Sequence, residues 1–520
     1  MTALAPIEHP PATAHLAAAA QHPFGLRLFV GVLGVLVAAI MSGLNNRVGG
    51  LALPDIKGGF GYGLDDGKWI GTVYTAAELA AMPISAWFAS TFSLRRYHIG
   101  VVLGFALLGL LMPFAPSYGA LLTMRALQGL LGGALIPVLM SAALRFFPLS
   151  IRLYGLSLYS LTATFAPNLA IWLAAVWTDR LFDWRLAYWQ IMPFSAFAVW
   201  AVWWGIPQDP VRLERFREAD WPGLVTGSIA LVMIAIGLDQ GERLDWFHSA
   251  LICWLLGGGI LAFIAFLISE FHHHLPFVKL QLLERRNLGL GLTIFVGLLI
   301  TLLSGSLLPS DQLADIQGFR PLQIAPIGLL VSLPQILLAP LAAWLLYQKC
   351  IDARRLLATG LLLIAISCWI GSFVTSEWMV AEFVIVQILQ AFGQPFAVVS
   401  MLFLATSVVA PMEGPFVSGL VNTLRAFSTL LGSTVLGHLL IVRSSSHEQT
   451  FVDRAGRSGM DLAPADIASV AERIAHQAFT LSIADCYRYL GLFALLLAPL
   501  TFFLQYIPPP TIPPRGQTQG

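Results

Sequence analysis

Residues 118–147 read YGALLTMRALQGLLGGALIPVLMSAALRFF, and Arg125 and Arg145 are the only charged side chains in this stretch. A helix of about 20 apolar residues crosses the roughly 30 Å of hydrocarbon in a bilayer. Only helices and closed barrels satisfy every backbone polar group inside a membrane, and this continuous apolar pattern has the length of a helix. The stretch therefore predicts a transmembrane helix.

The same stretch contains one copy of an internal repeat. The segment MRALQG at 124–129 has a counterpart, VQILQA, at 386–391, and each leads past small residues to a proline, Pro137 or Pro395. Repeated halves are common in secondary transporters, which bind their substrate at the interface between the halves. The repeat predicts two related halves in one chain.

The composition extends the membrane prediction to most of the chain. Of the 520 residues, 57% are hydrophobic and 11% are charged, whereas soluble globular proteins carry about 25% charged residues. The formal net charge of +1 and the lack of a basic stripe argue against nucleic acid as a partner. The cysteines are far apart and His272, His273 and His274 have no spaced ligand nearby, so we expect no metal and no cofactor. No nucleophile–base constellation or phosphate loop indicates an enzyme.

Apolar runs recur almost from end to end and predict an all-α protein whose solvent is mainly the lipid bilayer. We assign 14 transmembrane helices, as two six-helix halves at 26–206 and 288–507 with two inserted helices at 222–271. The individual runs lie at 26–48, 69–91, 97–115, 118–147, 154–178, 187–206, 222–240, 250–271, 288–310, 322–347, 356–374, 379–405, 415–443 and 486–507.

The basic residues orient the chain in the membrane. Lys and Arg are more frequent in the loops after even-numbered spans, such as Arg95–Arg96 and Arg354–Arg355, than in the loops after odd-numbered spans. Because basic loops stay on the cytoplasmic side, we predict cytoplasmic tails at 1–25 and 508–520. The long segment 444–485 then lies on the opposite side of the membrane.

Segment 444–485 contains the pattern of an amphipathic helix. Pro464 is suited to the first turn of a helix, and apolar residues follow on one face through residue 484. Such a helix packs on its own protein, lies in the membrane interface or meets a partner protein, and the pattern leaves all three open. The stripe consists of Ile467, Val470, Ile474, Ala478 and Leu481.

In the first half, two charged residues lie deep within predicted spans, where a charge costs at least about 2.5 to 3.5 kcal/mol and therefore indicates function. The rise from Trp69 to Glu78 at 1.5 Å per residue is roughly 13 Å. Arg125 enters from the same side and lies roughly 10 Å deep, so we expect the two side chains to be able to meet. Two interpretations follow: a fixed ion pair that locks two helices, or a carboxylate that binds and releases a proton.

Other polar residues inside spans are candidates for the lining of a substrate cavity. Asn45 and Arg47 are two residues apart, so they face different sides of a regular helix, and Arg47 either extends outward to the interface or faces the cavity. Asn168 and Trp172, beside Pro167, are four apart on the fifth span.

The second half offers a similar set. Gln387, Gln390 and Gln394 repeat along one side of a helix, while Asn422 and Arg425 are three residues apart near mid-depth. Polar side chains in such positions line a cavity or form hydrogen bonds between helices, and the sequence does not choose between these roles.

The chain resembles the major facilitator superfamily, and within it the fourteen-helix drug/proton antiporters of the EmrB and QacA type, closest to the EmrB branch. The resemblance rests on the 14 spans, the repeated halves and RALQG at 125–129. The segment LDQGERLDWF at 238–247, Arg425 and the long segment before the last span also match. In this family the arginine motif of the fourth span is tied to proton handling, which the resemblance carries onto Arg125 and Gln128.

Three segments depart from the family pattern. The first span reads LNNR at 44–47, where the family has an acidic residue. The loop motif at 86–96 lacks its usual Gly and Asp, and the antiporter motif at 166–175 has alanines in place of most glycines. We therefore predict that Glu78 carries the proton-binding role that the first span lacks.

The resemblance implies a proton-coupled multidrug or toxic-compound exporter that works by alternating access in a bacterial inner membrane. It also implies a periplasmic membrane-fusion adaptor and an outer-membrane channel as partners, with segment 444–485 as the contact to the adaptor. Two alternatives remain. One is a dedicated exporter of a single endogenous metabolite or siderophore-like compound, because Glu78, Arg125 and Arg425 would select a charged substrate. The other is an uncoupled sensor or assembly partner.

Overall fold

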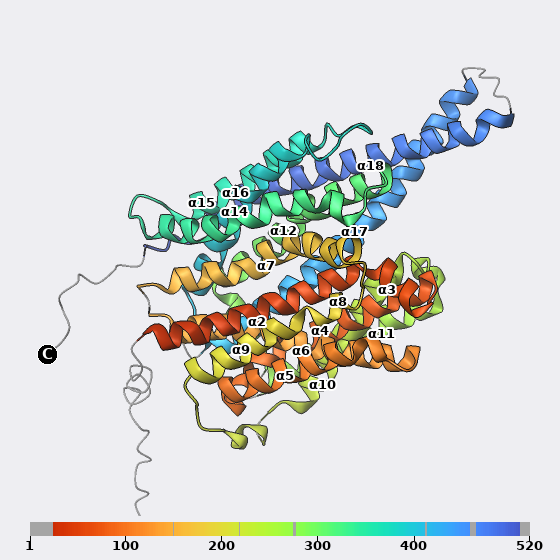
Figure 1. Ribbon diagram of the computed structural model, residues 1–520. Helices are drawn as coiled ribbons and strands as arrows, with labels where there is room; N and C mark the ends of the chain where they lie inside the picture. The colour runs from red at the N-terminus through yellow and green to blue at the C-terminus, as the bar shows by residue number, and fades with distance from the viewer. Residues whose placement is uncertain are drawn as a thin grey trace, which may run out of the picture.

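The computed structural model describes residues 24–148, 150–217, 219–273, 277–410, 413–457 and 464–509, which form helices and connecting segments without a strand. Figure 1 shows two groups of long helices side by side, the first in red to yellow and the second in green to blue. This arrangement confirms the predicted all-α membrane architecture.

The first group contains the helices up to residue 205. Short helices, α3 (Leu53–Phe60) and α8 (Leu186–Trp189), lie in the connections at one end of the bundle. The long helices are α2 (Leu26–Leu51), α4 (Leu64–Phe92), α5 (Leu94–Leu111), α6 (Tyr118–Phe146), α7 (Arg152–Ala175) and α9 (Ile191–Gly205).

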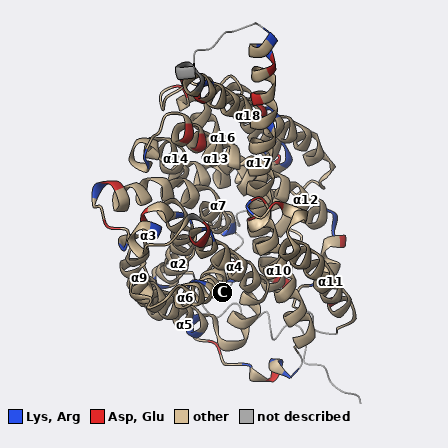
Figure 2. Ribbon diagram, turned by 90° about the vertical axis from the view of Figure 1, so that its right-hand side faces the viewer, with Lys and Arg blue, Asp and Glu red and all other residues tan. Residues whose placement is uncertain are grey.

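Two inserted helices, α10 (Trp221–Gly241) and α11 (Ala250–His272), follow. Figure 2 shows them at one edge of the bundle, where α10 packs against α4 and α11 packs against α10. The second group comprises α12 (Arg286–Thr301), α13 (Leu303–Asp311), α14 (Pro321–Tyr347), α15 (Ala353–Gly371), α16 (Val384–Thr406), α17 (Gly414–Arg457) and α18 (Pro464–Leu500).

Each predicted span coincides with a helix. Within the described part of the chain, 12 helices are long and apolar enough to cross a membrane. The other two predicted spans are α4, which carries Glu78 among other polar side chains, and α9, which has 15 residues. The structure therefore supports 12 of the spans, and the number 14 stays a prediction.

Glycines on α6 set the distance between α6 and α4. A methyl group at Gly129 would overlap the carbonyl group of Tyr74, and one at Gly133 would overlap the carbonyl group of Glu78. Small residues four apart allow helix backbones to approach closely in a membrane. This contact fixes the height at which Glu78 lies in the bundle.

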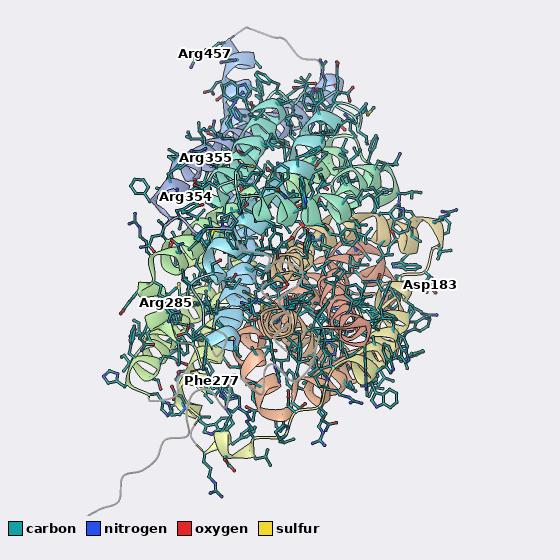
Figure 3. All side chains as sticks on the ribbon, turned by 90° about the vertical axis from the view of Figure 1, so that its left-hand side faces the viewer. Asp183, Phe277, Arg285, Arg354, Arg355 and Arg457 are labelled. Carbon is teal, nitrogen blue, oxygen red and sulfur yellow. The ribbon has the colours of Figure 1, made fainter. Side chains whose placement is uncertain are left out.

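We call the end of the bundle at Leu26 the inner end and the end at Leu51 the outer end. Figure 3 looks onto the inner end, where Arg285, Arg354 and Arg355 of the second group lie. The predicted orientation places this end in the cytoplasm.

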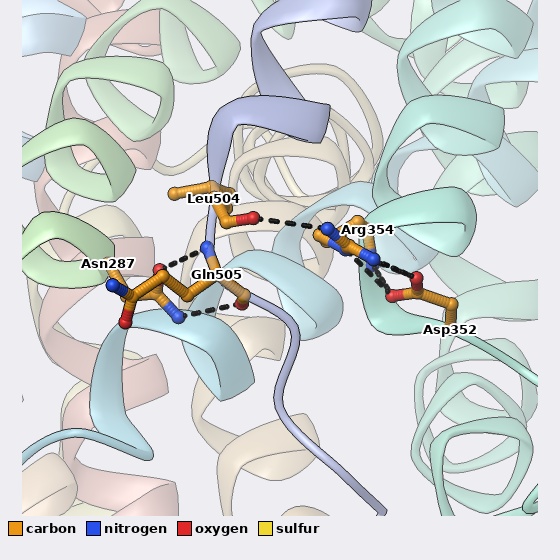
Figure 4. A network of polar contacts seen from close by, with 5 residues as sticks. All are labelled: Asn287, Asp352, Arg354, Leu504 and Gln505. Carbon is orange, nitrogen blue, oxygen red and sulfur yellow. Dashed lines mark hydrogen bonds and ion pairs between the residues drawn. The ribbon is translucent and has the colours of Figure 1, made fainter.

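Hydrogen bonds hold the end of the last helix at the inner end (Figure 4). The Asn287 amide donates to the Gln505 carbonyl at 3.0 Å and accepts from the Gln505 N–H at 2.6 Å. Arg354 donates to the Leu504 carbonyl at 3.2 Å and forms an ion pair with Asp352 at 2.8 Å. Together these contacts join the segment after α18 to the first turns of α12 and α15.

The segment predicted as a long outer loop, 444–485, is largely helical. Helix α17 continues to Arg457 and α18 begins at Pro464, so the two helices project beyond the outer end as a hairpin (Figure 1). The predicted helix start at Pro464 is confirmed, but the helix is continuous with the last span rather than separate. At the hairpin base, Asp485 accepts hydrogen bonds from Arg443 and His447 at 2.8 and 2.9 Å.

The predicted apolar stripe of this hairpin faces partly inward. Val470, Ile474 and Leu481 are half-buried and Ala478 is buried, whereas the side chain of Ile467 lies outside the described residues. The stripe thus contributes to packing within the protein and still exposes apolar surface.

Candidate functional site

A cavity of about 520 Å³ lies between the two groups of helices, in the outer half of the bundle. Its walls come from α2, α4, α7 and α10 on one side and from α12, α13, α16 and α17 on the other. Sites between helices of a bundle are a common location for small-molecule binding.

Close packing seals the cavity toward the inner end. A methyl group at Gly419 of α17 would overlap the carbonyl group of Pro83 in α4. Ser418 donates to the Pro137 carbonyl at 2.6 Å, and the Leu153 N–H donates to the Tyr347 hydroxyl at 3.2 Å. The cavity is therefore closed at the inner end and extends toward the outer end.

Both signs of charge line the cavity in equal number. Among the described residues, no two of these charged side chains form an ion pair within 4.0 Å. A ligand with charged groups would therefore find side chains that are not neutralised by direct contact. The six residues are Arg47, Lys68, Glu78, Asp239, Asp311 and Arg425.

Glu78 lies on the α4 wall and is 7% exposed. Its carboxylate accepts a hydrogen bond from the Asn46 amide of α2 at 2.8 Å. This contact links Glu78 to the part of the first span where the family pattern has an acidic residue.

Arg125 does not pair with Glu78 within the described structure. Its guanidinium lies 4.7 Å from the Tyr74 ring centre and 5.4 Å from that of Tyr188, and it donates to Gln128 at 3.0 Å. The side chain is 1% exposed and packs against Gly49 of α2. The expected contact is therefore absent, because cation–π contacts with two tyrosines hold the guanidinium away from the cavity.

Asn45 and Arg47 face different directions, as predicted from their spacing. Helix α2 continues through Gly49 and Gly50 without unwinding. Asn45 is 1% exposed and its amide has no hydrogen-bond partner among the described residues. Arg47 lines the cavity instead of extending to the membrane interface.

The three glutamines of α16 divide between the two roles that the sequence left open. Gln387 donates to the Gly305 carbonyl at 3.0 Å, and Gln390 donates to Ser304 at 2.9 Å and to Ser367 at 3.1 Å. These two side chains join helices of the second group. Gln394 lines the cavity and accepts from Gln335 at 2.9 Å.

Two candidates line the cavity and two do not. Arg425 lines it and donates to the Thr162 carbonyl at 3.3 Å, and its Nε atom has no partner among the described residues. Asn168 also lines it, and its amide oxygen has no partner in the part of the chain that the structure describes. Asn422 is fully buried and accepts from Tyr159 at 2.8 Å, so it joins the two groups of helices. Trp172 is 38% exposed and is not part of the lining.

Four charged or amide side chains of the site were missed from the sequence. Asn46, Lys68, Asp239 and Asp311 all line the cavity. Lys68 and Asp311 lie one residue outside the predicted spans, and the hydropathy pattern therefore assigned them to loops. Asp311 directly follows the predicted span 288–310. Extending each predicted span by one helical turn would therefore have included it.

A family model described as Major Facilitator Superfamily matches residues 35–316. The chain is 25% identical over 430 residues to the fatty acid resistance protein FarB of Neisseria gonorrhoeae, covering 81% of this chain and 82% of that protein. It is 24% identical over 436 residues to the multidrug export protein EmrB of Escherichia coli, with coverages of 81% and 82%. It is also 23% identical over 489 residues to the colistin resistance protein EmrB of Acinetobacter baumannii, with coverages of 89% and 94%.

Solved structures share the fold. The human organic anion transporter MFSD10 superposes with a TM-score of 0.57 at 15% identity, covering 93% of this chain and 100% of that chain. A peptide transporter POT in complex with sulfate superposes with a TM-score of 0.56 at 16% identity, with coverages of 94% and 99%.

Proposed function

Because this chain belongs to the Major Facilitator Superfamily and is a multi-pass membrane transporter, we propose that it is a proton-coupled exporter of multiple toxic compounds. It works by alternating access in a bacterial inner membrane, with both termini in the cytoplasm. The names of its relatives, which include multidrug export and fatty acid resistance proteins, support amphipathic compounds as substrates.

One observation carries the proposal: a carboxylate that contacts no arginine directly among the described residues lines a cavity between the two groups of helices. Ionisable side chains at membrane depth are costly and mark ion or proton pathways. Glu78 meets this description, and its partner Asn46 lies in the LNNR segment of the first span. The proton-binding group thus moves from α2 to the neighbouring helix while it stays in the same part of the cavity.

Arg425 and Arg125 give Glu78 two cationic neighbours. Arg425 faces the cavity from the opposite group of helices, so its distance from Glu78 changes when the groups move. Approach of a cation favours an ionised carboxylate and separation favours the protonated form. Arg125, oriented by Gln128, is a fixed part of the same field.

The driving force suffices for such a cycle. One charge that crosses 100 mV gains about 2.3 kcal/mol, and one pH unit adds about 1.4 kcal/mol. A single proton moving inward therefore supplies several kcal/mol to shift the conformational equilibrium.

The test is proton-driven flux of ethidium and of oleate in proteoliposomes with the full-length protein. Glu78→Gln should abolish flux driven by a pH gradient, because glutamine cannot bind the proton, while Glu78→Asp should retain part of it. Unchanged proton-driven flux in Glu78→Gln would overturn the proposal. Absence of flux for the unmodified protein with both probes would favour the uncoupled sensor or assembly partner.

The charged lining also supports a dedicated exporter of one charged metabolite or siderophore-like compound. Six charged side chains would select a substrate with complementary groups rather than admit many lipophilic ones. Competition between ethidium and a panel of charged metabolites distinguishes these possibilities, since a dedicated exporter should bind one member of the panel and leave ethidium untransported.

We further propose that the α17–α18 hairpin contacts a periplasmic membrane-fusion adaptor. An outer-membrane channel would be the third component of this export assembly. A groove of about 800 Å³ lies between the hairpin and Ile316, with Phe451, Val470 and Ile474 as apolar lining. Replacing Val470 and Ile474 with Ser should reduce co-purification of the adaptor and spare flux in proteoliposomes. Equal loss of both would show that the stripe only packs on the transporter.

A further inference from the structure

The charges of the cavity are arranged in crossed pairs. Glu78 of the first group has Arg425 of the second group as its main cationic partner, and the cation that acts on Asp311 of the second group is Arg47 of the first. Each group of helices therefore contributes one carboxylate and one arginine to the same cavity. The proposed function uses the carboxylate of Glu78 and leaves that of Asp311 without a role.

Asp311 occupies an unusual position in the backbone. It is the last residue of α13, two residues after Pro309, and a π-helical turn, η6 (Gln312–Ile316), follows it directly. Such turns are rare and frequently occur at functional sites. Gln312 anchors the turn by donating to the Thr375 carbonyl at 3.3 Å. The turn holds Asp311 on the cavity wall.

The surroundings of Asp311 do not neutralise it by contact. Within the described chain, neither Asp311 nor Arg47 forms a hydrogen bond through its side chain or an ion pair within 4.0 Å. The ionisable groups that face Asp311 are Arg47 from α2, Asp315 from η6, and Cys486 and Tyr487 from α18. A carboxylate so placed pays for desolvation when it is ionised, so a proton is its natural ligand.

We propose that Asp311 is a second proton-binding carboxylate of the transport cycle, with Arg47 as its positioning residue across the two groups of helices. The proposal rests on the proposed proton coupling at Glu78. In the conformation described here both carboxylates take up protons from the outer side. When the outer ends of the two groups approach, each arginine nears the carboxylate of the opposite group, and both protons leave toward the inner side.

The test is a proton count on the full-length protein in lipid, by infrared difference spectra between alkaline and acidic buffer. Among the protonated-carboxyl bands of the unmodified protein, one should disappear in Glu78→Gln and a different one in Asp311→Asn. Asp311→Glu should move the second band to the glutamate position. Asp315→Asn is the matched control, because this exposed carboxylate four residues later is outside the cavity lining. Both bands should remain present, and loss of the negative charge beside Asp311 should only move the titration of its band toward lower pH.

Arg47→Gln provides a test that leaves both carboxylates in place. Loss of the cation should move the titration of the Asp311 band toward higher pH and leave the Glu78 band unmoved. In proteoliposomes, Asp311→Asn should lower the protons exchanged per ethidium from two to one.

The outcomes separate the two proposals. If the Glu78 band is present but the Asp311→Asn spectrum equals that of the unmodified protein, the second proton site is wrong and the proposed function stands. If no band responds to Glu78→Gln while one responds to Asp311→Asn, the proton-binding role of Glu78 fails, and Asp311 is the carrier rather than a second one. If Arg47→Gln leaves the Asp311 titration unmoved, Arg47 is not its positioning residue.

Discussion

Helices α7 and α14 meet directly along their whole length, whereas α4 and α17 have α10 between them toward the outer end. In the α7–α14 seam, a methyl group at Gly328 would overlap the Asn168 carbonyl group, and Arg320 forms an ion pair with Asp179 at 2.7 Å at the outer end. At the inner end Tyr347 accepts the hydrogen bond from Leu153. This seam is a close backbone-to-backbone contact.

The α4–α17 seam is different toward the outer end. Ala76 and Leu79 of α4, Ala235 of α10 and Leu430 of α17 form one apolar cluster. Thr434 donates to the Leu238 carbonyl of α10 at 3.3 Å. The inserted helix therefore completes the wall of the cavity on this side, and Asp239, which accepts from Thr72 in α4, belongs to that wall.

The two seams differ in what their residues contribute: close packing in the α7–α14 seam and charged side chains in the α4–α17 seam. The α7–α14 seam gains its stability from close contact of small residues and backbone, which a membrane favours because lipid supplies no hydrophobic force between helices. The other side carries Glu78 and Arg425, which are costly at membrane depth. We infer that changes in the first seam affect stability, and that charge changes on the second side affect transport.

The largest effect is expected for Arg425→Gln on the second side. Loss of one charge interaction worth about 1.4 kcal/mol changes an equilibrium tenfold, so proton-driven flux in proteoliposomes should fall at least about tenfold. The melting temperature in detergent should remain unchanged, because within the described part of the chain the guanidinium makes a single hydrogen bond, to Thr162. Thr429→Val, one turn further along the same lining, is the control and should keep its flux. A fall in melting temperature with normal flux would show instead that Arg425 contributes to stability and not to transport.

A smaller effect, on stability, is expected for Gly328→Ala in the α7–α14 seam. Overpacking a close contact costs about 1 to 3 kcal/mol, so the variant should unfold at a lower temperature. Gly437→Ala on α17 is the matched control, since open space surrounds that position, and alanine should not destabilise the helix there. Equal melting temperatures for both variants would mean that the α7–α14 seam accommodates an added methyl group with little loss of stability.

The smallest effect is expected for Glu242→Gln, which changes a contact between α10 and α17 at the outer end. The affected quantity is the pH dependence of the distance between these two helices. Burial alone would raise the pKa of Glu242, but hydrogen bonds from Trp246 and His438 and the charge of Lys68 outweigh it and lower the pKa below its ordinary 4.5. The carboxylate and His438 are 2.8 Å apart and partly exposed, so the contact is worth about 0 to 1 kcal/mol.

The sign of its pH dependence follows from the lowered pKa. The contribution of Glu242 is complete above pH 4.5 and disappears as the pH falls through the lowered pKa. Distances between spin labels on α10 and α17 should therefore widen in acid for the unmodified protein. In Glu242→Gln they should be insensitive to this change, and an equal response in both proteins would show that the contact does not depend on the carboxylate.

The sequence predicted the depth of Glu78 but not its partner. Depth follows from the rise per residue of a helix, whereas the partner depends on how α2 turns beside α4. Asn46 rather than Arg125 makes the contact, because Arg125 lies over the rings of Tyr74 and Tyr188. A linear pattern contains no information on which of two equally deep side chains turns toward the other.

The glutamines of α16 also show that a sequence pattern does not identify the partner of each side chain. Their spacing predicts one polar side of a helix, and Gln387, Gln390 and Gln394 do follow one another along the second group. Only the last one lines the cavity, because the helix crosses the cavity at its middle and packs against α13 and α15 before that point.

By itself, the sequence determined the membrane as solvent, the helical architecture and the family, because apolar runs and short motifs are local and act through the period of one helix. The tertiary structure alone decided that the cavity is closed at the inner end and that α10 completes its wall. It also decided that Glu78 and Asp311 each face an arginine of the opposite group of helices. These features depend on residues hundreds of positions apart, and their contacts are set by how helices with glycine and proline at particular heights pack against one another.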